Sequence, residues 1–100
     1  NAGFGNLVLR NAVDANRNTA FGNSAGLRLI DGNDNVFIGY NSGNVPEQVQ
    51  YVNNSMALGV NSYTEKDNQI AIGNSTQLFV KILGVEFTKA QIQALKALVS

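Results

Sequence analysis

The chain has 100 residues, 44% of them apolar, and its seven basic and seven acidic residues give a formal net charge of zero. It contains no cysteine and no histidine, which excludes thiol nucleophiles, Ser–His–Asp triads and most transition-metal sites within one chain. Neutral charge argues against a general nucleic-acid surface and against a polybasic membrane anchor. No apolar stretch approaches the roughly 20 residues of a membrane span. We therefore expect no enzyme activity, no catalytic residues, no metal or cofactor, no nucleic acid and no membrane insertion.

A short motif recurs along most of the chain. Each copy has a polar residue, three mostly apolar residues and a glycine, as in Asn35-Val-Phe-Ile-Gly39, and Asn or Ser follows within three residues. Successive motif glycines are separated by 17, 17, 20 and 14 residues and stand at Gly5, Gly22, Gly39, Gly59 and Gly73. A near-fixed step of this size is typical of stacked supersecondary units. The sequence therefore predicts a short β-solenoid in which each motif is a strand ending in a tight turn.

The solenoid places the motif glycines in one column. A column of glycines indicates a backbone position with φ above zero, or one with no room for a Cβ atom. Asn and Ser suit the positions that follow, because their short side chains tolerate the left-handed region and hydrogen-bond the turn backbone. The structural repeat glycines that we expect in this column are Gly22, Gly39, Gly59 and Gly73.

Alternation within each strand separates two faces, since side chains point to opposite sides with period two. We expect the first and third apolar positions, such as Val36 and Ile38, to fill the core of the coil itself. The middle position then points outward, and because it is never charged we expect a partner chain to cover it. These middle residues, predicted to pack in the oligomer, are Ala20, Phe37, Ala57 and Ala71. The pattern leaves twofold and threefold symmetry open.

The connections are less regular. The candidates for a second strand in each coil are Leu7–Leu9, Leu27–Ile30 and Val49–Val52. The longest connection, residues 44–52, contains Pro46 and is expected to bulge outward. Residues 31–35 begin like a calcium loop, but Val36 and Ser42 occupy the places where such a loop needs glycine and a bidentate Glu. We interpret that segment as a surface turn.

The pattern changes after residue 77, which divides the chain into β-roll repeats (1–77) and a closing strand with a helix (78–100). Thr88 and Gln91 form a capping box, which predicts a helix beginning at this point. The helix carries an apolar stripe made of Ile92, Leu95, Leu98 and Val99. Because a helix of about 12 residues is marginal alone in water, we expect the stripe to plug the roll end, to bundle with symmetry mates, or to do both.

The segment Asn54-Ser-Met-Ala-Leu-Gly-Val-Asn-Ser62 resembles the head repeats of trimeric autotransporter adhesins, the YadA-like head, whose motif reads roughly Asn-Ser-Val-Ala-Ile-Gly-x-x-Ser. The earlier copy Asn18-Thr-Ala-Phe-Gly-Asn-Ser-Ala-Gly26 is more similar to the variant found in bacteriophage tail fibres. The resemblance covers about residues 1–77, and the ending does not match an autotransporter neck. It implies an all-β, left-handed parallel β-roll that is homotrimeric and serves attachment.

Two functions follow from these expectations. The first is a receptor-binding part of a phage tail fibre or bacterial adhesin, located extracellularly on a virion or bacterial surface, whose partner is a host cell-surface glycan or protein. Its candidate contact residues are Tyr40, Tyr51 and Tyr63, because aromatic rings offer rigid contact area, although packing between coils explains them equally well. The second function is a structural shaft or trimerisation tip without receptor contact. Because the chain begins inside a repeat and without Met, we expect it to be a piece of a longer protein.

Overall fold

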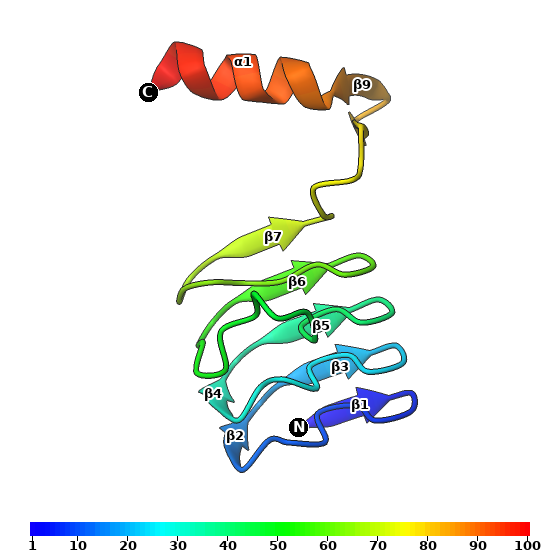
Figure 1. Cartoon of the computed structure of the whole chain (residues 1–100), viewed down its shortest axis with the longest axis vertical. Coiled ribbons are helices and arrows are strands. Elements are labelled where there is room, and N and C mark those ends of the chain that lie inside the picture. The colour runs from blue at the N-terminus through cyan, green and yellow to red at the C-terminus, as the bar shows by residue number, and fades with distance from the viewer.

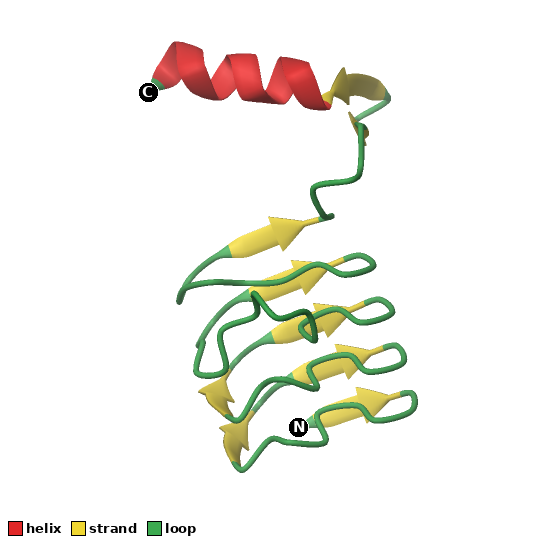
Figure 2. Ribbon diagram, in the orientation of Figure 1, coloured by secondary structure: helices red, strands yellow, loops and turns green.

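The computed structural model describes residues 1–100 as a stack of β-coils with a hairpin and a helix beyond its last coil (Figure 1). The molecule is elongated and measures 41 × 26 × 24 Å. Figure 2 shows that the strands are short, that loops join them, and that the helix lies at the C-terminal end. The β-solenoid predicted from the motif spacing is confirmed.

One parallel sheet runs along the whole stack. Each of its strands pairs in register with the next, so that Ala20 lies opposite Phe37 and Phe37 lies opposite Ala57. The same motif position of every repeat therefore falls in one column. The strands, in their order across the sheet, are β1 (Ala2–Phe4), β3 (Thr19–Phe21), β5 (Val36–Ile38), β6 (Met56–Leu58) and β7 (Ile70–Ile72).

The second strand of the coils lies elsewhere than predicted. A two-stranded parallel sheet pairs β2 (Asp14–Asn16) with β4 (Asp31–Asn33), whereas Leu7–Leu9, Leu27–Ile30 and Val49–Val52 form turns and loops. Leu7 and Leu9 have φ values of 60° and 50°, which an extended strand does not allow. The segment interpreted as a surface turn instead supplies β4, so both of these sequence predictions were wrong.

The two faces of the main sheet are also the reverse of the prediction. The middle residues Ala20, Phe37 and Ala57 are buried inside the roll, and Ala71 in the last coil is half-buried. The first and third positions point outward, and Phe21 is 54% exposed. The interior of so small a coil is narrow, and three of these four middle positions carry alanine. Phe37 fits there because Gly43, which has no Cβ, lies against its ring.

Polar ladders also join the coils inside the roll. Asn35 Nδ2 donates to the carbonyl of Val52 at 2.8 Å, and Asn35 Oδ1 accepts from the amide and hydroxyl of Ser55 at 3.0 and 2.9 Å. In the coil below, Asn18 Oδ1 accepts from the amide of Asn35 at 2.9 Å. A buried polar group left without a partner costs about 1–3 kcal/mol. The polar residue that opens the motif is therefore part of the core in the three middle repeats, at Asn18, Asn35 and Ser55.

The glycine column confirms the sequence reasoning most closely at Gly39. Its φ is 127°, and a Cβ atom placed there would lie 2.7 Å from the carbonyl carbon of Gly59 in the next coil. Two residues after Gly22, Gly39 and Gly59, the residues Ser24, Asn41 and Asn61 adopt φ values of 62°, 62° and 57°, in the left-handed region expected for them. Gly59 is less crowded, because a Cβ there would meet nothing nearer than 3.4 Å.

Beyond the roll, the chain forms an antiparallel hairpin and then the helix. Strands β8 (Phe79–Ile82) and β9 (Val85–Thr88) enclose a turn at Leu83 and Gly84, where the sequence predicted a single closing strand. Helix α1 (Lys89–Val99) follows, and it is neither long nor apolar enough to span a membrane. The capping box is confirmed: Thr88 Oγ1 accepts from the amide of Gln91 at 3.1 Å, and Gln91 Oε1 accepts from the amide of Thr88 at 2.9 Å.

Candidate interaction surface

The outward face of the main sheet is apolar along the whole stack. The third residue of each strand forms one column on this face, in which Ile72 is 72% exposed and the rings of Phe4 and Phe21 stack with their centroids 4.9 Å apart. The column consists of Phe4, Phe21, Ile38, Leu58 and Ile72. Strands of parallel sheets are ordinarily covered on both faces. A single chain therefore leaves this face of the sheet uncovered.

The neighbouring column on the same face is formed by the first residue of each strand. It is also free of charge, and its members are Ala2, Thr19, Val36, Met56 and Ile70. A sheet face that is meant to stay wet carries charged or polar side chains at such positions. We refer to the two columns together as the outer face. Its composition is that of a contact surface rather than of a solvated one.

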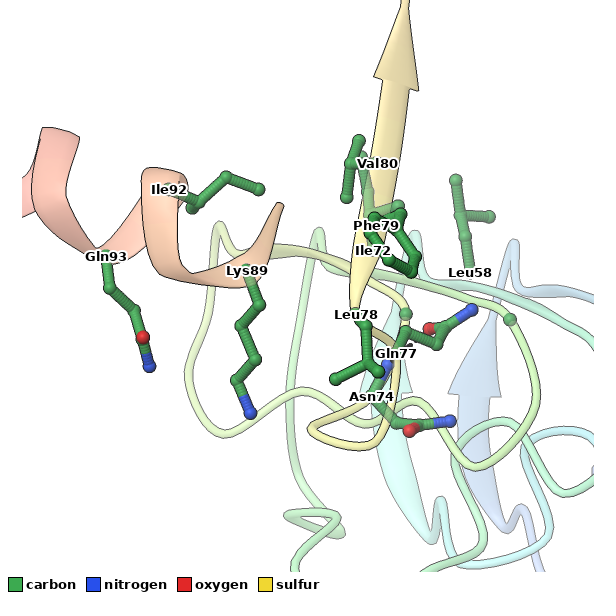
Figure 3. Close-up of a pocket in the computed structure, with 12 residues that line it drawn as sticks. Leu58, Ile72, Asn74, Gln77, Leu78, Phe79, Val80, Lys89, Ile92 and Gln93 are labelled. Atoms are coloured by element: carbon green, nitrogen blue, oxygen red, sulfur yellow. Dashed lines mark hydrogen bonds between the residues drawn. The ribbon is translucent and has the colours of Figure 1, made fainter. Parts of the chain in front are cut away.

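A groove of about 560 Å³ continues the outer face at the C-terminal end of the stack (Figure 3). The sheet contributes Leu58 and Ile72 to its lining, and helix α1 contributes Ile92. Figure 3 shows Ile72, Phe79 and Val80 gathered together, with Ile92 on the helix beside them. The remaining apolar lining, from the segment after the roll, consists of Leu78, Phe79 and Val80.

The groove lining carries one charged group. It is the ammonium of Lys89, whose Nζ donates to the carbonyl of Ser75 at 2.7 Å. The rest of the lining is apolar or uncharged, so the groove is suited to a mainly apolar occupant.

Helix α1 leaves its apolar stripe uncovered. No residue of the helix is buried, and Leu98 is 82% exposed. Figure 1 shows α1 lying across the end of the stack, set apart from β7. The expectation that the helix plugs the end of its own roll was therefore wrong within one chain: the hairpin holds α1 away from the last coil. Packing of Ile92, Leu95, Leu98 and Val99 against other copies stays a prediction.

The exposed area of the chain is large for its mass. The molecule exposes 6424 Å², whereas a folded monomer of 10.7 kDa typically exposes about 5,500 Å². The excess is roughly 900 Å², close to the roughly 800 Å² that each partner buries in a standard protein interface. The outer face, the groove and the helix stripe contribute apolar side chains to that exposed area.

The three tyrosines lie in different surroundings. Tyr40 and Tyr51 are both 57% exposed, and Tyr63 is half-buried. Tyr51 borders a polar hollow of about 290 Å³, together with Asn33 and Asn53 and the in-register carboxylates Asp14 and Asp31. An exposed aromatic ring beside amide and carboxylate groups provides both stacking area and hydrogen-bonding partners. Tyr63 also borders a hollow, of about 230 Å³, but its ring is half-buried, so Tyr51 is the tyrosine that offers both an exposed ring and polar neighbours.

The long connection over residues 44–52 bulges outward only in part. Gln48 is buried: its Nε2 donates to Thr64 Oγ1 at 3.0 Å, and its Oε1 accepts from the amide of Thr64 at 2.9 Å. Val52 is buried as well, while Pro46 and Glu47 are exposed. Two anchors therefore fix the loop to the roll, and they hold Tyr51 in a defined place beside the hollow.

The charged groups are spread over the surface. The one ion pair joins Arg17 Nε and Asp34 Oδ1 at 2.7 Å across two successive coils. The hydrogen bond from Arg17 lowers the pKa of Asp34, and the bond to Asp34 raises the pKa of Arg17. No group of three or more acidic side chains that could hold a metal ion is present.

No protein-family model, no curated protein and no solved structure matches this chain.

Proposed function

We propose that this chain is a domain of a homotrimeric fibre, of the kind found in phage tail fibres and bacterial adhesins, that works outside the cell in attachment to a host surface. The observation that carries the proposal is the outer face, an apolar and charge-free side of a parallel sheet that one chain leaves uncovered. Another copy of the same chain is the simplest cover, because it brings an identical apolar face.

Threefold symmetry and a left-handed coil direction belong to this proposal through the resemblance to YadA-like head repeats. The residues that carry the resemblance have clear structural roles. Ser55 belongs to the buried polar ladder, Gly59 belongs to the glycine column, and Ser62 donates to the carbonyl of Gly59 at 2.7 Å. A repeat whose motif positions are all committed to holding the roll together leaves contact with a host to the loops.

The proposed receptor contact is the hollow beside Tyr51. A host glycan presents hydroxyl groups and the flat faces of sugar rings, which match the amides, carboxylates and exposed ring found there. The carboxylates of Asp14 and Asp31 favour a neutral or amino sugar over an acidic one. A trimer presents three such hollows, so weak single contacts add up through avidity.

Attachment is tested by binding the intact protein to host cells and to a glycan array, with Tyr51→Ala as the probe variant. Tyr40→Ala is the matched control, because both rings are equally exposed. We expect the Tyr51 variant to lose most of the binding and the Tyr40 variant to keep it. Equal binding by all three proteins would leave attachment standing and remove Tyr51 from it.

A structural shaft or trimerisation tip is the second candidate. The observation that favours it is the C-terminal unit, residues 78–100, in which no residue is buried within one chain. Its apolar side chains are therefore available to pack against other chains and hold them in register. Absence of binding by the intact, assembled protein would favour this function over attachment.

A further inference from the structure

We propose that helix α1 of each protomer packs into the apolar groove of a neighbouring copy of the same chain, instead of bundling with the other helices. The groove meant here is the one lined by Leu58, Ile72, Leu78, Phe79 and Val80. The inference rests on the proposed homo-oligomer and adds to it a specific exchange of the C-terminal segment between chains.

A groove of this size is not filled by its own chain. Only Ile92 and Gln93 in the middle of the helix, together with Lys89 at its start, reach the groove lining. The distal stripe residues Leu95 and Leu98 lie outside it and are 58% and 82% exposed. The chain thus carries an apolar groove without an occupant and an apolar helix end without a groove. Both apolar surfaces are buried when the helix end of one copy enters the groove of the next.

The direction of the helix argues against a helical bundle. Figure 1 shows α1 lying across the stack, along the direction of the strands rather than along the long axis of the molecule. In the aligned mode of sheet packing, copies that meet through their outer faces keep the long axes of their stacks roughly parallel. Their helices would then lie crosswise to the common axis, whereas a parallel coiled coil needs helices that run along it.

The length of the helix agrees with an exchange. Its 11 residues span about 16 Å at 1.5 Å per residue. Only its first half, up to Gln93, lines its own groove, so the second half extends past that groove and is free to contact a neighbouring chain. By contrast, 11 residues are fewer than two heptads, while a recognisable coiled coil sustains its pattern over at least three.

Charge favours the same arrangement. Helix α1 carries Lys89 and Lys96 and no acidic residue, so a bundle of identical helices would bring like charges together. The groove is mostly apolar, and its single cation, Lys89, is hydrogen-bonded to the carbonyl of Ser75. Lys96 stays free to face solvent when the stripe beside it is buried.

Engineered cysteines test the exchange in the full chain, which has no natural cysteine. One variant carries Ile72→Cys in the groove, a second carries Leu98→Cys on the helix, and the two are refolded together and oxidised. Because each chain holds only one cysteine, a groove-to-helix disulfide must join two chains. Lys66→Cys, in the exposed turn before β7 of the same coil, replaces Ile72→Cys as the matched control.

The exchange predicts that oxidising the mixture of the Ile72 and Leu98 variants shifts a large part of the protein to twice the chain mass of 10.7 kDa on a non-reducing gel, and more than oxidising the Ile72 variant alone does. The Lys66 and Leu98 pair is expected to stay uncross-linked. Cross-linking of the Leu98 variant with itself alone would indicate a helical bundle and overturn the inference.

A chain that carries both substitutions gives a second readout. If the helices are exchanged, oxidation of this chain gives disulfide-linked species on the gel, and the largest of them has the mass of the whole oligomer. An internal disulfide at the mass of one chain would mean that the helix folds back onto its own groove, which also overturns the inference. The mass of the unmodified protein distinguishes failure of the exchange from failure of the proposed function. If the protein is an oligomer but forms no groove-to-helix cross-links, only the exchange is contradicted. If the protein is a monomer, the proposed function itself is contradicted.

Discussion

The roll and the C-terminal unit of this chain are stabilised in opposite ways. In the roll, stacked coils bury Ala20, Phe37 and Ala57 together with a ladder of hydrogen-bonded Asn and Ser side chains. In the hairpin and helix, by contrast, no residue is buried, and the apolar side chains of β8, β9 and α1 face outward. The roll is thus complete inside one chain except for its outer face, whereas the C-terminal unit depends on what packs against it.

This difference assigns different roles to similar apolar residues. Ala57 inside β6 holds one chain together, while its neighbours on the outer face are available to hold several chains together. Substitutions in the roll interior are therefore expected to unfold the chain, and substitutions in the C-terminal unit are expected to change assembly without changing the roll.

The largest effect is expected at the glycine column. In Gly39→Val the new side chain must accept a φ of 127° and would meet the carbonyl of Gly59, so we expect the roll to lose about 2–6 kcal/mol of stability. Gly84→Val is the matched control from the C-terminal unit, since its φ of 78° is also positive but nothing lies within 4 Å of the new Cβ. Chemical denaturation gives both values, and equal losses in the two variants would break the comparison.

The polar ladder inside the roll should give the next largest effect. Asn35→Ala leaves the amide of Ser55 and the carbonyl of Val52 without their partners, and we expect a loss of roughly 2–4 kcal/mol. Asn11→Ala, which removes an exposed hydrogen bond to the carbonyl of Leu27, should stay within about 0.5 kcal/mol of the parent protein. Similar urea midpoints for the two variants would show that the ladder adds nothing to the roll.

A change in the C-terminal unit sharpens the comparison from the other side. Leu95→Ser removes apolar area that one chain leaves exposed, so the circular dichroism of the roll should be unchanged. Assembly should weaken by about 1–2 kcal/mol per chain, because the side chain is buried only between copies. Sedimentation over a dilution series measures this. A variant that dissociates at the same concentration as the parent would show that the stripe takes no part in assembly.

The smallest effect concerns the ion pair of Arg17 and Asp34 on the roll surface. Because the pKa of Asp34 is lowered in the folded chain, its contribution is complete above the pKa of the unfolded chain and is lost as the pH falls through the folded value. An NMR titration of the Asp34 carboxyl should show this lowered pKa, and Arg17→Gln should return it towards the ordinary value. Since both side chains are exposed, the melting temperature at neutral pH should hardly change between the two proteins.

The repeat architecture was predictable because the motif fixes it locally. A positive φ at Gly39 and at Asn41, the capping box at Thr88 and a column of like positions all follow from residue chemistry and spacing. These features depend on neighbours within a few residues or one coil away. The turn residues therefore predicted the number and the positions of the main strands correctly.

Which face of each strand points into the roll was not predictable in the same way. Period-two alternation separates the residues of β5 into two sets but does not say which set is inside. The signal that would have decided it is Gly43, whose missing side chain makes room for Phe37 within the roll. The second-strand prediction failed for a related reason, since the apolar run at Leu27–Ile30 packs through turns while polar Asp14–Asn16 and Asp31–Asn33 pair as strands.

The central claim is that the outer face is covered by other copies of this chain. The mass of the intact protein in solution, measured by multi-angle light scattering at micromolar concentration, tests it most directly. We predict three times the chain mass of 10.7 kDa. A mass equal to that of one chain would contradict the account.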